Sequence, residues 1–284
     1  QAMGAVIEVQ HGYIEAHLPP GQTRLKGAHI ATDMITVTGT ENFLMAAALA
    51  DGITVLENAA REPEIEDLAG YLNRCGAHIH GAGESCIVIE GVPHLYGSTY
   101  TVMPDRIAAA TYMAAAAVTG GTVLLRDVNS EHLLPVLSAF ESTGCAVMQS
   151  GSELLLRAPQ RLKPVRHVRT MPYPGFPTDA QAPVMTMAAV GDGTSIFVEN
   201  IFESRYKHVG ELCRLGANIK VEGRVAIVEG VPRLFGASVE APDLRGGAAL
   251  IVAGLAADGL TEVSGLRHVD RGYEAIEKSL NQIG

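Results

Sequence analysis

The chain has 284 residues, 47% of them hydrophobic, which is enough for two ordinary domains with sizeable cores. Its formal net charge of −10 argues against a nucleic-acid-binding protein, because such a protein carries a basic patch. The longest apolar run, residues 248–257, is too short to cross a bilayer, so neither nucleic acid nor a membrane is an expected partner.

The cysteines and histidines do not indicate a metal or redox protein. The four cysteines form no CxxC pair, and each falls within an apolar helix or strand pattern, which predicts buried, reduced thiols and a cytoplasmic protein. His78 and His80 share one face of a predicted strand, but no third residue has a ligand spacing, so we expect no metal. The sequence contains no P-loop, GxGxxG or GxSxG motif, and we expect no cofactor.

Similar phrases recur about every 70 residues, which indicates a repeat protein. One phrase is a helix end, a glycine and a strand; its glycines are Gly4, Gly76, Gly144, Gly216 and Gly284. Consecutive members of this set are 72, 68, 72 and 68 residues apart. A second phrase is nearly verbatim, with GVPHLYGSTY beginning at Gly91 and GVPRLFGASV at Gly230. The chain therefore spans four similar units.

One period can be read in full between residues 41 and 103. Residues 41–50 form an alanine-rich helix, and residues 53–57 form a strand. A second helix begins near Pro63, because proline is tolerated in a first turn, and it ends at Gly76 as a helix with a glycine cap does. Strands are expected around His78, at residues 87–89 and at residues 99–102. The pattern predicts an α/β protein.

The stretch TMPYPGFPTDAQAP, residues 170–183, cannot be a helix or a central strand. Three prolines and a glycine within six positions predict a stiff, extended loop. The loop delivers Thr178 and Asp179 to an apolar run, residues 182–190, that reads as a helix. Either residue could cap that helix, or the loop could hold the Asp179 carboxylate in a cleft as a base. The local sequence leaves both interpretations open.

Six motifs occur in the order that characterises a known family. They are ENAAREPEIEDL (57–68), MPDRI (103–107), PYPGFPTD (172–179), IFESRYKHVGEL (201–212), APDLRGG (241–247) and HVDRGYE (268–274). With them, almost the whole chain resembles the UDP-N-acetylglucosamine 1-carboxyvinyltransferase (UDP-N-acetylglucosamine enolpyruvyl transferase) family. The resemblance implies two domains, each an inside-out α/β barrel of three repeats, with the active site between them. Residues 1–103 would belong to a partial first domain, and residues 104–284 to a second domain with the catalytic base.

The resemblance also implies that about four of six family units are present. The family's first units carry a Lys-Asn pair and a mobile loop whose Cys or Asp protonates phosphoenolpyruvate, and no cysteine here replaces that acid. We therefore expect this chain alone to be inactive. We also expect its incomplete first domain to self-associate, since open sheet edges invite pairing.

The resemblance assigns the chemistry to five charged side chains. Asp179 would take the proton from the sugar 3-hydroxyl, with Arg205 orienting it. Arg245 and Arg271 would bind the carboxylate and phosphate of phosphoenolpyruvate, because a guanidinium group can donate two parallel hydrogen bonds to two oxygens of such an anion. Asp243 would be a second active-site carboxylate, although a helix cap is the ordinary interpretation of an aspartate in this context.

Five uncharged residues complete the implied site. Thr178 would assist sugar binding, or only cap a helix. Ile201 and Phe202 would line the sugar site, with ordinary strand core as the alternative for Phe202. Thr36 and Val37 would contact the nucleotide end of the substrate through the backbone.

The implied reaction is the transfer of an enolpyruvyl group from phosphoenolpyruvate to UDP-N-acetylglucosamine, the step that opens peptidoglycan synthesis. It would proceed by addition and elimination without metal or organic cofactor. Two alternatives remain at this point. One is the related enzyme that makes 5-enolpyruvylshikimate 3-phosphate, and the other is a non-catalytic module that binds a nucleotide sugar.

Overall fold

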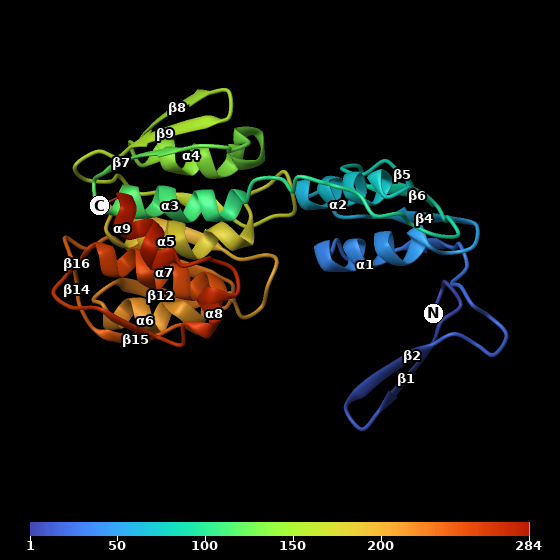
Figure 1. Cartoon of the computed structure of the whole chain (residues 1–284). Helices are drawn as coiled ribbons and strands as arrows, with labels where there is room; N and C mark the ends of the chain where they lie inside the picture. Colours follow the sequence, from blue (N-terminus) through green and yellow to red (C-terminus); the bar gives the residue numbers. More distant parts are fainter. Residues whose placement is uncertain (284) are drawn as a thin grey trace. The chain divides into compact units, whose positions relative to one another are not determined.

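A computed structural model describes residues 1–283 of the chain (Figure 1). Its backbone groups into two compact units that divide between Met103 and Pro104. Each unit has its own buried hydrophobic cluster. The last glycine of the repeat, Gly284, lies outside the described residues.

The first unit contains one sheet, two helices and a separate hairpin. The sheet has the order β3-β4-β6-β5, in which β3 and β4 are parallel and the other pairs are antiparallel. Helices α1 and α2 pack on each other, and α1 also packs on β6. The elements are β1 (Val6–Gln10), β2 (Tyr13–His17), β3 (His29–Ala31), α1 (Val37–Ala48), β4 (Ile53–Glu57), α2 (Pro63–Arg74), β5 (His78–His80) and β6 (Cys86–Glu90).

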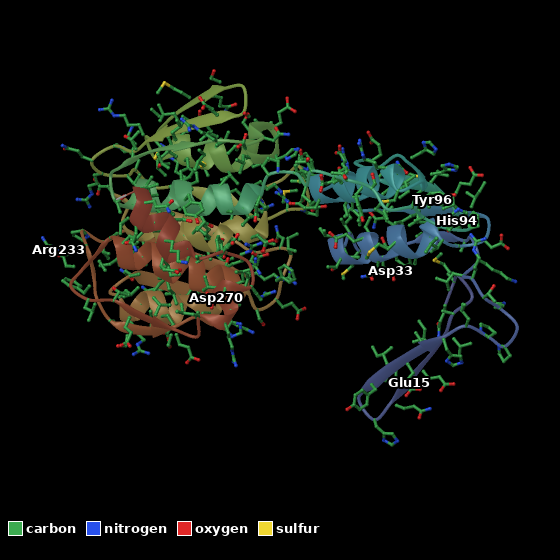
Figure 2. All side chains as sticks on the ribbon, viewed as in Figure 1. Glu15, Asp33, His94, Tyr96, Arg233 and Asp270 are labelled. Carbon is green, nitrogen blue, oxygen red and sulfur yellow. The ribbon has the colours of Figure 1, made fainter. Side chains whose placement is uncertain are left out.

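The hairpin of β1 and β2 is exposed along almost its whole length. It projects away from α1 and the sheet of the same unit, and the label of Glu15 marks its second strand in Figure 2. Val9 and Ile14 face each other across the strands, and both side chains are 74% exposed. Apolar side chains in such a position are available to pair with another surface.

The second unit is built around three helices, α3 (Arg106–Val118), α5 (Gln181–Ala189) and α7 (Leu244–Leu255), which pack against one another (Figure 1). Small residues are frequent in all three helices, and Thr186 of α5 donates a hydrogen bond to the Ala249 carbonyl of α7 at 3.2 Å. The sheets β7-β9-β8 and β10-β11-β13-β12 and the pair β15-β17 belong to the same unit.

The elements of the second unit follow in three groups, one for each central helix. The first is α3 (Arg106–Val118), β7 (Thr122–Leu125), η1 (Ser130–Leu133), α4 (Leu134–Ser142), β8 (Ala146–Ser150) and β9 (Glu153–Arg157). The second is β10 (His167–Arg169), η2 (Thr178–Ala180), α5 (Gln181–Ala189), β11 (Thr194–Val198), η3 (Arg205–His208), α6 (Val209–Arg214), β12 (Asn218–Glu222) and β13 (Val225–Glu229). The third is β14 (Leu234–Phe235), β15 (Ser238–Glu240), α7 (Leu244–Leu255), β16 (Ala257–Asp258), β17 (Glu262–Ser264), α8 (Arg267–Asp270) and α9 (Ile276–Ile283).

Backbone geometry explains the repeated glycines. Gly4, Gly76, Gly144 and Gly216 have φ values of +86°, +101°, +92° and +94°, in the left-handed region where glycine has no steric penalty. The last three each follow a helix and turn the chain into the next strand, as a glycine C-cap does. The repeat in sequence is therefore a repeat of one helix-to-strand turn.

Three sequence-based expectations need correction. Residues 99–102 form no strand, and Tyr100 instead anchors this segment by donating from its hydroxyl to the Asp67 carbonyl at 3.0 Å. The first predicted helix begins earlier, at Val37, because Thr36 caps it through Gly39 N–H. All four cysteines are free, but Cys86 and Cys213 are exposed, because both lie on the outer face of their elements.

We predict that Gly230→Ala lowers the free energy of unfolding by about 2–3 kcal/mol, because an added methyl group would have to displace packed backbone. A Cβ at this position would lie 1.7 Å from the Gly191 carbonyl oxygen. Gly91, the equivalent residue of the first unit, meets the Ala50 oxygen at 1.9 Å and should respond similarly. Urea unfolding measures the change.

The matched control is Gly210→Ala in α6, where an added Cβ meets nothing within 4 Å. Because alanine favours a helix over glycine, this variant should be unchanged or more stable by up to about 1 kcal/mol. Equal stabilities for Gly230→Ala and Gly210→Ala would contradict the close-approach explanation.

Candidate active site

The pairing of two parallel strands positions the candidate site. Strands β10 and β11 run parallel, with Val168 opposite Phe197 and Arg169 opposite Val198. The carboxyl ends of parallel strands lie at one edge, so the loops that leave β10 and β11 begin side by side. The first loop leads to Asp179, and the second leads to Phe202 and Arg205.

Asp179 lies in η2, directly before α5, and its side chain caps neither helix. Pro177 is the residue that precedes η2, and Ala180 precedes α5, so neither position carries a capping side chain. The cap interpretation of Asp179 is therefore wrong. Its carboxylate is instead directed to two arginines.

Arg205 and Arg245 both contact the same carboxylate oxygen. The Arg205 Nη2 group donates to Asp179 Oδ1, and Arg245 Nε lies 3.2 Å from that oxygen. Among the described residues, no hydrogen bond or ion pair reaches Oδ2. The two arginine side chains are only 16% and 19% exposed, so they are held close to the carboxylate.

Two opposing effects determine the pKa of Asp179. Burial by itself would raise this pKa, because it penalises the charged form. The positive charges and hydrogen bonds of Arg245 and Arg205 outweigh burial, and the pKa is lowered overall. Asp179 is therefore a carboxylate at neutral pH.

An open pocket of about 460 Å³ brings all five predicted charged residues together. Its lining includes Asp179, Arg205, Asp243, Arg245 and Arg271, as well as Phe202, Glu203, Ser204, Lys207 and Leu244. Arg271 is exposed, and no ion pair to it occurs within residues 1–283. The pocket therefore contains cationic groups that can bind an anion. It also contains three carboxylates, of which Asp179 is already paired with two arginines.

Helix α7 contributes both Asp243 and Arg245 at its N-terminus. Asp243 accepts a hydrogen bond from Gly246 N–H at 2.8 Å, so it caps the helix and lines the pocket as well. A helix N-terminus attracts anions, and Arg245 in its first turn strengthens that attraction. The two interpretations of Asp243 are therefore compatible.

Tyr273 holds Arg245 from the other side. Its ring is buried, its hydroxyl lies 2.8 Å from the Thr111 hydroxyl of α3, and this hydroxyl also interacts with the Arg245 guanidinium. Since Thr111 donates to the Ile107 carbonyl, Tyr273 donates to Thr111, and its oxygen remains free to interact with the Arg245 cation. Sequence reasoning did not single out Tyr273, although it lies in the HVDRGYE motif.

The uncharged predicted residues are distributed over both units. Thr178 donates to Glu199 Oε2 at 3.0 Å. Ile201 and Phe202 follow β11 and are 38% and 50% exposed, so they are not strand core; the Phe202 ring lies 5.1 Å from the Arg205 guanidinium carbon. Thr36 and Val37 lie in the first unit, at the start of α1.

Two buried residues beside the site were missed. Glu199 is 1% exposed and directly follows β11. The similar phrases TVLEN and IFVEN align Glu199 with Glu57, but Glu57 is the last residue of strand β4 and is exposed. His208 is also 1% exposed, and its Nε2 atom has no hydrogen-bond partner within the described part of the chain. The repeat phrases place Glu199 one residue away from its structural equivalent, which hid its burial. His208 lies inside the motif IFESRYKHVGEL, but nothing in that pattern of residue types indicates that it is buried.

Within residues 1–283, no group of three His, Cys, Asp or Glu side chains could hold a metal ion. No helix in the same range is long and apolar enough to cross a membrane.

The chain is an α/β protein whose pocket holds an arginine-paired carboxylate, and comparison with known proteins specifies the family. The family described as EPSP synthase (3-phosphoshikimate 1-carboxyvinyltransferase) matches residues 1–280. The chain has 48% and 49% identity to UDP-N-acetylglucosamine 1-carboxyvinyltransferases 2 and 1 of Caldanaerobacter subterraneus, over 99% and 100% of its length. It has 50% identity, over its full length, to UDP-N-acetylglucosamine 1-carboxyvinyltransferase 1 of Symbiobacterium thermophilum.

Solved structures show the same fold. The enolpyruvyl transferase NikO from Streptomyces tendae has a TM-score of 0.85 at 24% identity, over 100% of this chain and 69% of that one. EPSP synthase from Acinetobacter baumannii has a TM-score of 0.71 at 22% identity, over 99% of this chain and 68% of that one. The chain belongs to the enolpyruvyl (1-carboxyvinyl) transferase family, and the predicted resemblance and fold class are confirmed. It spans 67%, 67% and 64% of the three curated relatives.

We predict that His208 makes the protein less stable in acid. Burial lowers its pKa to about 4, although Asp243 and a backbone contact at Arg205 oppose the decrease. As the pH falls from about 6.5 to about 4, the unfolded chain binds a proton that the folded chain excludes, so folding stability is lost in that window. The difference corresponds to at most about 3 kcal/mol. Urea unfolding across this pH range measures it.

His208→Gln removes the titrating group and should reduce the loss of stability in acid. The exposed His167 provides the control, since His167→Gln should leave the pH dependence unchanged. A steep acid loss that persists in His208→Gln would show that other groups cause it.

Proposed function

We propose that this site transfers the enolpyruvyl group of phosphoenolpyruvate to the 3-hydroxyl of UDP-N-acetylglucosamine, with release of phosphate. The observation that carries the proposal is the Asp179 carboxylate paired with Arg205 and Arg245, in a pocket that also contains Arg271, which has no ion pair within residues 1–283. The chain is also about half identical to relatives named for this reaction. Relatives named for UDP-N-acetylglucosamine favour it over the shikimate pathway enzyme.

Asp179 is the base of the proposed reaction. Its Oδ2 atom accepts the proton of the sugar 3-hydroxyl, and the oxygen attacks C2 of phosphoenolpyruvate. A carboxylate with a lowered pKa is a weak base, whereas a general base works best when its pKa approaches the working pH. An anionic substrate that binds Arg245 competes with Asp179 for the guanidinium, which raises the pKa of the base when it is needed.

Arg245 and Arg271 bind the carboxylate and phosphate of phosphoenolpyruvate in this proposal. Guanidinium groups bind such oxygens with paired hydrogen bonds, and Tyr273 keeps Arg245 oriented. Ile201 and Phe202 provide the apolar side of the sugar site. Thr36 and Val37 contribute backbone contacts to the nucleotide, and residues 1–103 and 104–284 act as the two domains of the enzyme.

After the attack on C2, the methylene carbon gains a proton, and the tetrahedral intermediate carries both phosphate and carboxylate. Loss of a proton from the new methyl group and cleavage of the C2–O bond to phosphate then restore the double bond. The acid for the methylene carbon is not assigned to a residue of this chain. We place the reaction in the cytoplasm, at the start of peptidoglycan synthesis.

We predict that Asp179→Asn in the native full-length protein lowers kcat by about 10²–10⁴-fold, because the amide cannot take the proton. Phosphate release from phosphoenolpyruvate with UDP-N-acetylglucosamine measures the rate. Calorimetry should show that the sugar nucleotide still binds, since asparagine keeps the shape of aspartate.

Asp192→Asn is the matched control, because Asp192 pairs with Arg161 at an exposed position. It should leave kcat unchanged. Shikimate 3-phosphate in place of the sugar nucleotide tests the alternative reaction, and faster turnover with it would reject the proposed substrate. A rate within about tenfold of wild type in Asp179→Asn would reject the base.

We also propose that the chain self-associates through the exposed β1–β2 hairpin. The double variant Val9→Lys/Ile14→Lys should abolish association, because charges on an exposed strand oppose pairing. Sedimentation equilibrium compares this variant with Glu8→Gln/Glu15→Gln, which changes the other face of the same hairpin and should still associate. A monomeric wild-type chain at high concentration would rule out association by this surface.

A further inference from the structure

Glu199 is a buried acidic residue that no assigned role explains. It is 1% exposed and directly follows strand β11. Burial of a carboxylate is unfavourable unless hydrogen bonds compensate the lost hydration. Four donors surround this one, and they come from two separate loops of the second unit.

The carboxylate contacts both loops of the candidate site. On the loop after β10, the Thr170 hydroxyl donates to Oε1 at 2.8 Å, and the Thr178 hydroxyl donates to Oε2 at 3.0 Å. On the loop after β11, the backbone N–H groups of Ile201 and Phe202 donate to Oε1 at 2.9 and 3.1 Å. A single side chain therefore joins the residue before Asp179 to the segment that leads to Arg205.

These contacts close a ring around the proposed base. Asp179 pairs with Arg205, whose guanidinium carbon lies 5.1 Å from the centre of the Phe202 ring. The Phe202 backbone donates to Glu199, and Glu199 accepts from Thr178, the neighbour of Asp179. A shift of Glu199 would therefore change the position of Asp179 relative to Arg205 from both sides.

The equivalent position of the first unit, which lies outside the candidate site, provides a comparison for Glu199. There, Asn58 directly follows β4, and its side-chain amide donates to the Thr32 carbonyl at 2.8 Å. Thr32 follows β3 as Thr170 follows β10. The amide of Asn58 makes this one bond at a strand end, whereas the carboxylate of Glu199 gathers four donors from the segments that build the pocket.

We propose that Glu199 is a positioning residue, which holds the turn that carries Asp179 in register with the segment that carries Phe202 and Arg205. The inference rests on the function proposed for Asp179. It assigns Glu199 no contact with substrate, because its side chain lies beneath the pocket residues it holds.

The experiment compares Glu199→Ala with Glu199→Gln in the native full-length protein. Both variants remove the charge, but only alanine removes the hydrogen bonds. A glutamine oxygen can replace Oε1, and its NH₂ group can donate to the Thr178 hydroxyl, which accepts as well as donates. Comparison of the two variants therefore separates the effect of the lost hydrogen bonds from the effect of the lost negative charge.

In Glu199→Ala, the amides of Ile201 and Phe202 should exchange with solvent faster, and kcat should fall by about 10–100-fold. The KM for phosphoenolpyruvate should change by less than about threefold, because Arg245 is held independently through Tyr273. Glu199→Gln should keep both amide protection and kcat within about threefold of wild type. Glu222→Ala, at an exposed end of β12, controls for loss of an acidic side chain.

Thr170 provides a second pair of variants if Glu199→Ala fails to fold. Its hydroxyl donates to Glu199 and accepts from Asn200 N–H at 2.9 Å, and the residue is fully buried away from the pocket. Thr170→Val should lower kcat in the same way, whereas Thr170→Ser keeps the hydroxyl and should restore it.

Two results would overturn the inference. One is faster amide exchange in Glu199→Ala with kcat within about threefold of wild type, and the other is an equal loss of kcat in Glu199→Gln. Asp179→Asn measured in parallel separates the two proposals. If Asp179→Asn is inactive while Glu199→Ala is fully active, only the role of Glu199 fails; if Asp179→Asn is active, the proposed base fails and the inference with it.

Discussion

The parallel pairing of β10 and β11 is the interaction on which the candidate site depends. Its register brings Thr170 and Glu199 together at one edge of the sheet, where they share a hydrogen bond of 2.8 Å. Both site loops leave the sheet there. Without this pairing, the proline-rich loop would still be stiff, but its far end would have no fixed relation to Arg205. The geometry of the proposed base is thus a consequence of strand register.

Electrostatics adds a second constraint. Asp179 is partly buried, and burial alone would favour its neutral form. The two arginines reverse that preference and also hold the carboxylate through a single oxygen. Arg245 lies in the first turn of α7, where a positive charge is unfavourable for the helix, and Asp243 and Asp179 offset it. The result is a group of charges that balance one another and that an incoming anion would rearrange.

Close packing of small residues stabilises the interior of the second unit. Helices α3, α5 and α7 pack against one another and are rich in alanine, with glycine in α7 and threonine in α3 and α5, so their backbones can approach one another. Glycines such as Gly230 let backbone pass within contact distance of the neighbouring turn. This packing holds α7, and therefore Arg245, in a fixed position relative to η2, which carries Asp179. The precision of the site depends on the tight interior beneath it.

The sequence by itself determined the local structure and the period of the repeat. Strand β4 and helix α2 follow from residue spacing, the helix-to-strand turns follow from glycines with positive φ, and the extended loop before Asp179 follows from three prolines. These features depend on neighbours in the chain, so they can be read locally. The motifs also indicated the family and the charged residues of the pocket.

Only the tertiary structure decided how those residues act together. It showed that Asp179 pairs with arginines instead of capping a helix, that Tyr273 holds Arg245, and that Glu199 joins the two site loops. Each of these contacts joins residues that are between 21 and 66 positions apart in the sequence. In the case of Glu199, the repeat phrases also suggest the wrong structural equivalent. Strand register and helix packing set such distances, and no local pattern of residue types encodes them.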